Sequence, residues 1–244
     1  MNAIETKDLT KRFKDTLAVD GLNLFVQQGE LLALLGVNGA GKTTIIKMLS
    51  CLLAPTSGDA LLLGDSIVTG PQAVKEKINL SPQETAVAPN LSVKENLELI
   101  AEVYGYDKKT AQAKAQELVK AFALTEVADN RAKILSGGMQ RRLSIAMALI
   151  SDPQILFLDE PTLGLDVIAR RELWATIKKL KGRITIILTT HYMEEAEALS
   201  DRVAVMAQGS LKAVGTAADL IAQTGAKNFE DAFINLATDR GVSL

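Results

Sequence analysis

One glycine-rich segment has the composition of a phosphate cradle. Residues 36–43, GVNGAGKT, match the pattern G-x-x-x-x-G-K-[ST] and follow an apolar run. We expect backbone amides of this loop to wrap phosphates, the Lys42 ammonium to neutralise β- and γ-phosphate charge, and the Thr43 hydroxyl to ligate Mg²⁺. The candidate nucleotide-binding residues are Asn38, Gly39, Ala40, Gly41, Lys42, Thr43 and, by hydroxyl or amide, Thr44. The segment predicts binding of a nucleoside triphosphate.

A second segment, LSGGMQRR at 135–142, has the features of another anion-binding helix start. Ser136 is a good N-cap, and Gly137 and Gly138 bring no side chain that would block their amides. An apolar-periodic helix is expected from Met139 to Ile150. Unpaired N–H groups and the helix dipole attract anions at such a start. Alone, the segment is equally an ordinary capped helix start.

Two acids and one histidine end apolar runs that read as buried strands. Asp159 and Glu160 follow residues 155–158, and His191, the only histidine, follows residues 184–190. Ligands bind at the carboxyl ends of strands in open α/β sheets. Neighbouring strand residues point to opposite sides, so the two acids should have different roles. The plainer alternatives are acids that cap a loop and a structural histidine.

Three further candidates each have an ordinary structural interpretation. Taken alone, Gln83 reads as a surface glutamine, Phe13 as a core phenylalanine and Asp166 as a helix N-cap. After His191, we expect Glu194, Glu195 and Glu197 to form the exposed start of a helix.

The surrounding elements alternate between strands and helices as in an α/β protein. Continuous apolar strands are expected at 31–35, 155–158 and 184–188, β-type segments at 4–9, 17–25 and 60–63, and a hairpin about residues 208–209. Helices are expected at 44–49, at 92–101 behind a capping box, and at 110–122, 170–180, 216–221 and 229–236.

Composition limits the function classes. The chain has 244 residues, 48% of them hydrophobic, a mean hydropathy of +0.15 and a net charge of −2. No apolar stretch reaches the roughly 18 residues of a membrane span. We expect no signal peptide, no general nucleic-acid surface, and a buried inert Cys51 in the helix after the phosphate loop.

The motifs together resemble those of ATP-binding-cassette (ABC) proteins. LSGGMQRR resembles the family signature, and the aromatic, phosphate loop, glutamine, signature, acid pair, aspartate and histidine follow in the family's order over about 4–239. The resemblance implies an α/β fold: a P-loop NTPase core with a mostly parallel sheet, an N-terminal antiparallel β subdomain and an inserted helical subdomain. It implies one domain over 1–244, with a core lobe at about 1–83 and 152–223, a helical subdomain at about 84–151 and a tail at about 224–244.

The resemblance also implies roles for the candidate residues. In the family, the signature of one subunit caps the nucleotide on the phosphate loop of a second, which gives that role to Ser136, Gly137 and Gly138. The implied catalytic residues are Lys42, Gln83, Glu160, which polarises the attacking water, and His191, which contacts the γ-phosphate. The implied Mg²⁺ residues are Thr43, Gln83 and Asp159. Phe13 would stack on adenine, and Asp166 would link the two sites of a dimer.

The implied function is that of a transporter ATPase subunit. Two copies, or this chain and a related one, would close around two Mg-ATP and drive a separate membrane permease from the cytoplasmic face. Met139, Gly164 and HYMEEAE at 191–197 resemble the drug, haem and ion exporter branch. The alternative is a soluble ABC ATPase that acts on ribosomes or DNA. A P-loop kinase or GTPase would have no use for the signature.

Overall fold

Two β-sheets and the helices around them make up the computed structural model, which describes residues 1–238. Residues 239–244 of the predicted tail lie outside the described part. Within residues 1–238, no helix combines the length and apolarity that a bilayer span requires.

The larger sheet has six strands in the order β11-β10-β4-β9-β8-β7. Neighbouring strands are parallel throughout, except that β10 and β11 form an antiparallel hairpin. The strands are β4 (Leu31–Leu35), β7 (Ile78–Ser81), β8 (Ile155–Asp159), β9 (Thr185–Thr190), β10 (Arg202–Ala207) and β11 (Ser210–Gly215). This topology confirms the predicted mostly parallel sheet.

The smaller sheet is antiparallel and is built from the N-terminal part of the chain. Strand β1 lies between β2 and β5 and also pairs with β3, while β6 continues the sheet beyond β5. The strands are β1 (Asn2–Phe13), β2 (Thr16–Leu22), β3 (Phe25–Gln27), β5 (Ser57–Leu62) and β6 (Asp65–Ser66). The segment predicted at 17–25 is thus divided between two strands, and the predicted antiparallel β subdomain is confirmed.

Side-chain caps mark the start of most of the α-helices, while α1, α2 and α7 begin without one. Ser92 and Glu95 form the predicted capping box of α3. The side chains of Ser136 and Asp166 cap α5 and α6 by accepting hydrogen bonds from backbone amides. The α-helices are α1 (Lys42–Leu49), α2 (Pro71–Lys75), α3 (Val93–Val103), α4 (Lys108–Ala121), α5 (Gly137–Leu149), α6 (Val167–Lys178), α7 (Met193–Leu199), α8 (Ala217–Thr224) and α9 (Phe229–Ala237). Short 3₁₀ turns, η1 (Thr125–Val127) and η2 (Ala132–Ile134), precede α5.

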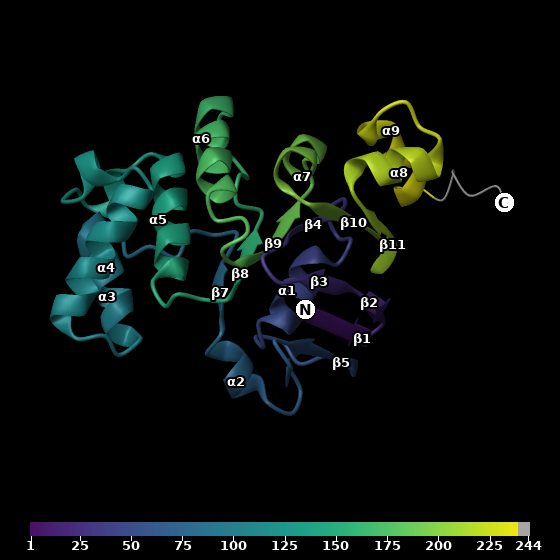
Figure 1. The fold of residues 1–244 in the computed structure, drawn as a ribbon, viewed down its shortest axis with the longest axis horizontal. Coiled ribbons are helices and arrows are strands. Elements are labelled where there is room, and N and C mark those ends of the chain that lie inside the picture. The colour runs from purple at the N-terminus through teal and green to yellow at the C-terminus, as the bar shows by residue number, and fades with distance from the viewer. Residues whose placement is uncertain (239–244) are drawn as a thin grey trace.

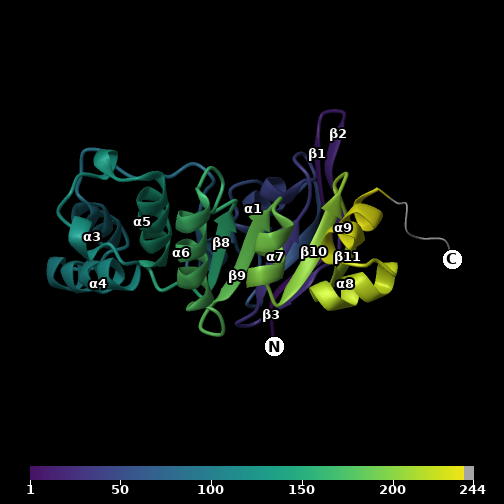
Figure 2. The same ribbon diagram turned by 90° about the horizontal axis from the view of Figure 1, so that it is seen from above.

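The layers follow from burial of the central sheet on both faces. Helices α6 and α7 lie on one face, and α1 with the antiparallel sheet lies on the other (Figure 1). Helices α3, α4 and α5 gather at the β7 end, and α8 and α9 at the β11 end (Figure 2). The predicted lobe boundaries fall between β7 and α3 and between α5 and β8. The division into lobes stays a prediction.

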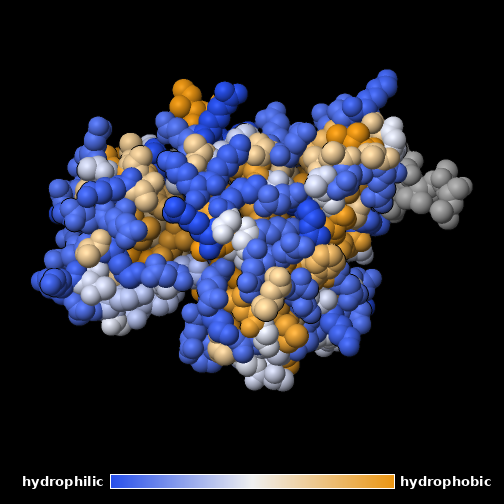
Figure 3. Space-filling view, viewed as in Figure 1, coloured by the Kyte–Doolittle hydropathy of each residue, from blue (hydrophilic) through white to orange (hydrophobic). Residues whose placement is uncertain are grey.

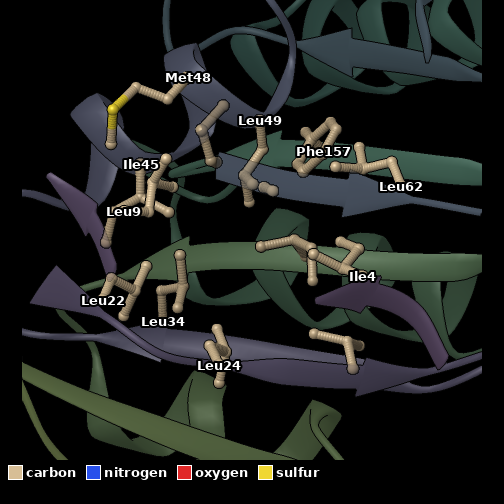
Figure 4. Close-up of a cluster of buried hydrophobic side chains, with 14 of the residues drawn as sticks. Ile4, Leu9, Leu22, Leu24, Leu34, Ile45, Met48, Leu49, Leu62 and Phe157 are labelled. Carbon is tan, nitrogen blue, oxygen red and sulfur yellow. The ribbon is translucent and has the colours of Figure 1, made fainter. Parts of the chain in front are cut away.

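Alternate residues of β4 belong to different parts of the core. Leu32 and Leu34 pack in the cluster between the two sheets (Figure 4). Leu31 belongs to the cluster that β8, β9, α6 and α7 share with the helices at the β7 end, while Ala33 and Leu35 belong to the cluster with α8 and α9. All five residues of the strand are buried, which explains why it reads as a continuous apolar run.

Two expectations from the sequence are wrong. Glu195, expected on an exposed helix start, is 0% exposed, because α7 turns it toward α6 and the indole of Trp174. Cys51 lies beyond the end of α1 in a turn with a φ of 56° and is only half-buried, because the helix stops at Leu49.

Candidate functional site

The predicted phosphate loop opens on a cleft of about 360 Å³ at the carboxyl ends of β4, β8 and β9. The cleft combines most of the predicted site residues with two others. Its lining consists of Ala18, Asn38, Gly39, Ala40, Gly41, Lys42, Thr43, Thr44, Gln83, Glu160, Leu163 and His191.

The backbone of the loop needs glycine where it passes β2 and β10. Gly41 has a φ of 98°, and a Cβ there would lie 2.4 Å from the Ala18 carbonyl oxygen. A Cβ at Gly36 would lie 2.5 Å from the Met206 carbonyl oxygen. Gly41 is also the N-cap of α1 and makes no side-chain cap bond. The first amides of α1 therefore face the cleft without a side-chain partner, as a phosphate site requires.

The Lys42 ammonium is buried at the base of this cradle. It donates to the carbonyl oxygens of Gly36 (2.7 Å) and Val37 (3.2 Å). It also lies 3.5 Å from Glu160 Oε1. A buried charge with mostly neutral partners favours any anion that enters beside it. The contacts suit Lys42 to receive phosphate oxygens.

Asp159 and Glu160 point to different partners, as the strand geometry predicts. Asp159 Oδ1 accepts from the hydroxyls of Thr43 (3.2 Å) and Thr189 (2.5 Å). A carboxylate beside a hydroxyl supplies the oxygen ligands that Mg²⁺ prefers, with the remaining positions left for water and phosphate. Among the described residues no group of three or more His, Cys, Asp or Glu could hold a metal ion. The Thr43 hydroxyl and the Asp159 carboxylate fit a metal that also binds a phosphate.

Glu160 turns away from the strand into the cleft. Its φ of 47° is in the left-handed region, which is uncommon outside glycine, and its N–H donates to Thr189 Oγ1 at 3.0 Å. Its Oε2 lies 2.7 Å from His191 Nδ1. Strained backbone of this kind persists only where surrounding contacts hold it. The carboxylate is thus fixed between an imidazole and an ammonium.

The Gln83 segment is held by a residue that the sequence interpretation did not assign. Arg141, on the signature helix α5, donates from Nη1 to the Pro82 carbonyl oxygen (2.6 Å) and from Nη2 to that of Gln83. Burial lowers the pKa of Arg141 from its ordinary value, and the charges of Asp159 and Glu195 oppose that shift. The Gln83 side chain stays exposed at the edge of the cleft.

Six predicted site residues do not line this cleft: Asp159, which contacts Thr43 from the end of β8, and five others. Phe13 is 45% exposed at the end of β1, so the alternative of a core phenylalanine is wrong. Ser136, Gly137 and Gly138 lie at the start of α5, next to α6, where a Cβ on Gly138 would lie 3.0 Å from that of Ala169. Asp166 accepts from the amides of Ile168 and Ala169, both at 2.9 Å, as the helix N-cap.

Two more residues of the site went unassigned from the sequence. Thr189 contacts both acids, and Ala18 brings β2 against the phosphate loop. A polar residue inside the apolar run before His191 was the available signal for Thr189. Ala18 gave no signal, because its position depends on a pairing between distant strands.

Comparisons with known proteins agree with this geometry. The family model described as "ABC transporter" matches residues 19–163. The chain is 42% identical to the Daunorubicin resistance ATP-binding protein DrrA3 of Streptomyces coeruleorubidus, over 91% of this chain and 71% of that one. It is 40% identical to the Probable multidrug ABC transporter ATP-binding protein YbhF of Escherichia coli, over 97% of this chain and 42% of that one.

Solved structures give the same result. An ATP-binding subunit of an ABC transporter superposes with a TM-score of 0.84 at 28% identity, over 96% of this chain and 99% of that one. A dimeric ATP-binding cassette in a post-hydrolysis state, bound to ADP and Pi, superposes with a TM-score of 0.79 at 26% identity, over 87% of this chain and 98% of that one.

Replacing Lys42 with alanine is expected to weaken nucleotide binding. Hydrogen bonds to a charged group contribute roughly 1.5–3 kcal/mol, which corresponds to about a ten- to hundredfold rise in Kd. Titration calorimetry with Mg-ATP measures the change. Lys47→Ala removes the same charge from the exposed side of α1 and serves as the control. Equal Kd values for Lys42→Ala and the unaltered chain would contradict the assignment.

Proposed function

This chain belongs to the ABC transporter family and is one of its ATP-binding ATPases, and from that premise we propose that it powers export through a separate membrane permease. The single observation that carries the proposal is the separation of two anion-binding helix starts. One opens on the cleft, and the other, at Ser136, lies on the surface outside it.

A second copy would complete the site. Ser136 and Gly137 are exposed, and large apolar side chains are exposed around them and the start of α6: Ile134, Leu163, Val167 and Ile168. Exposed apolar groups gathered beside a polar site mark protein interfaces. The similar cassette that is dimeric with bound ADP and Pi supports the same arrangement here. Each nucleotide would then lie between the Lys42 cradle of one copy and the Ser136 helix start of the other.

The residues of the cleft divide the chemistry of hydrolysis among them. Lys42 would exchange its carbonyl partners and Glu160 for phosphate oxygens when ATP enters. Glu160 would then be free to accept a proton from the attacking water, with His191 beside it to contact the γ-phosphate. Thr43, Asp159 and the Gln83 amide would hold Mg²⁺, which neutralises phosphate charge when it is bound. Phe13 would stack on adenine, and Asp166 would contact the partner copy.

An apolar groove beside the cleft supports a permease as the partner. It lies between the helical end of the molecule and the central sheet, with Leu80, Pro82, Ile100, Val103 and Met147 in its lining. Figure 3 shows hydrophobic residues gathered between these two parts. Val103 is 72% exposed at the rim. The Arg141 bonds to the Pro82 and Gln83 carbonyls connect this groove to the nucleotide cleft.

A segment of a membrane permease at the cytoplasmic face is the occupant we propose, with the chain bound peripherally. Nucleotide binding would move the Gln83 loop, and this movement would shift the permease segment that is bound in the groove. Export as the direction is supported by relatives that are named for drug resistance and Nod factor export.

Replacing Glu160 with glutamine is expected to leave ATP binding intact and to lower turnover by about 10²–10⁴-fold, because the base for the water is lost. The variant should accumulate as a dimer with Mg-ATP, since closure no longer leads to hydrolysis. Phosphate release and size-exclusion chromatography measure the two effects. Glu194→Gln, an exposed glutamate on α7, is the control. A strictly monomeric variant in saturating Mg-ATP would count against the closed dimer.

Replacing Ser136 with arginine is expected to spare ATP affinity, because Ser136 lies outside the cleft of its own chain, and to abolish dimer closure and turnover. Gln112→Arg adds the same charge to the exposed face of α4 and should leave both unchanged. Normal ATPase activity in Ser136→Arg would remove the contact across the dimer.

Purification from its own membranes in detergent is expected to recover the chain with a multi-span membrane protein. Val103→Glu should lose this partner and keep ATP binding, because it places a charge at the rim of the apolar groove. Val68→Glu, at an exposed position elsewhere, should keep the partner. Recovery of ribosomes or DNA instead would overturn the transport proposal in favour of a soluble ABC ATPase.

A further inference from the structure

Behind the Glu160–His191 pair lies a buried carboxylate that takes no direct part in the cleft. Glu195, on α7, is 0% exposed and does not line the cleft. Its Oε1 accepts the indole N–H of Trp174 at 3.0 Å, from α6. Burial raises the pKa of Glu195, while the Thr190, Trp174 and Thr162 side chains and the Arg170 charge oppose the shift. An ionisable group is rarely kept in such a place without a role.

The side chains around Glu195 connect α6 to the segment that carries His191. Arg170 and Trp174 are one turn apart on α6, so they lie on the same side of the helix. The Arg170 guanidinium lies over the Tyr192 ring at 4.7 Å, and Trp174 reaches Glu195. The Tyr192 ring in turn lies 4.1 Å from that of His191.

The start of α7 has no side-chain cap, although the Tyr192 amide donates to Thr190 Oγ1 at 3.0 Å. Tyr192 is its N-cap and makes no side-chain cap bond. The Glu195 amide donates to the Tyr192 carbonyl oxygen at 3.2 Å, within the same turn. The end of β9 and the contacts that Tyr192 and Glu195 make with α6 therefore position His191 together.

The cluster also contains unsatisfied polar atoms. Over residues 1–238, the buried side-chain nitrogen and oxygen atoms without a hydrogen-bond partner are Thr162 Oγ1, Arg170 Nε and Glu195 Oε2. All three residues belong to this cluster, and Thr162 is two residues after Glu160. The Thr162 hydroxyl nevertheless lies close enough to Glu195 to favour its charged form, so the buried polar atoms of this cluster face one another.

We propose that Glu195 is a positioning residue for ATP hydrolysis: its carboxylate holds the Thr190–Tyr192 segment against α6, so that His191 stays within hydrogen-bond distance of Glu160. Glu195 touches neither nucleotide nor water and acts only through His191. The inference rests on the roles proposed above for Glu160 and His191.

The test compares Glu195→Leu and Glu195→Gln in steady-state ATPase assays and ATP titration. Glu195→Leu should lower kcat about ten- to hundredfold, the range found when outer partners of functional residues are removed. KM and the Kd for ATP should change less than twofold, since no residue of the cradle is altered. Glu195→Gln retains an acceptor for the Trp174 indole and should lose less activity.

A double-mutant cycle separates positioning from general destabilisation. In a His191→Ala background, Glu195→Leu should cause no further loss of the residual turnover, because its effect passes through the missing imidazole. Leu199→Ala forms a cavity on the same helix and is the control for destabilisation alone. It should lower the Tm and leave kcat, measured well below the Tm, within about twofold of the unaltered chain.

The outcomes distinguish the two proposals. Suppose that His191→Ala loses activity. The positioning role is then overturned if Glu195→Leu leaves kcat unchanged, or if Glu195→Leu lowers turnover equally in the unaltered and the His191→Ala backgrounds. Full activity of His191→Ala would instead remove His191 from the proposed site and the inference with it. If Glu195→Leu does not fold, Trp174→Phe is the substitute, because it removes the indole donor. Trp174→Phe should lower kcat only when His191 is present. An equal loss in the His191→Ala background would overturn the proposal.

Discussion

The parallel register of β4, β9 and β8 is the constraint on which the site depends. Leu35 pairs with Thr190 and Asp159 pairs with Thr189, so the three strands end at one level. The phosphate loop, the acid pair and His191 each follow one of these ends and therefore meet in one cleft. Parallel strands do not pair without crossover connections, which the helices provide. The elements that cover the sheet are thus the same elements that bring the site together.

Much of this arrangement was predictable because it is local. A five-residue apolar run predicts β4, and a serine with a glutamate three residues later predicts the capping box of α3. In the phosphate loop, Gly41 adopts a positive φ that favours glycine. In each case the deciding interactions lie within a few residues along the chain. The end of a parallel strand places Asp159 and Glu160 at one edge of the sheet, while the left-handed φ of Glu160 sets the direction of its side chain.

What the sequence did not predict depends on contacts between distant segments. A glutamate in the first turn of a helix is normally exposed to solvent. The burial of Glu195 depends on its contact with Trp174, which lies on another helix. Thr189 becomes part of the site because β8 and β9 are neighbours. Ala18 reaches the phosphate loop through the fold of the antiparallel sheet. The start of α5 is predictable as a helix start, but its position outside the cleft of its own chain is a property of the whole fold.

Trp174 is the only tryptophan of the chain, and its indole donates a hydrogen bond to the buried carboxylate of Glu195, four residues after His191. The unaltered protein therefore carries a single indole fluorophore, and it lies at the joint between α6 and α7. Its emission reports the polarity of that joint without any added label. A movement of α6 against α7 during nucleotide turnover would therefore change the emission of the unlabelled protein.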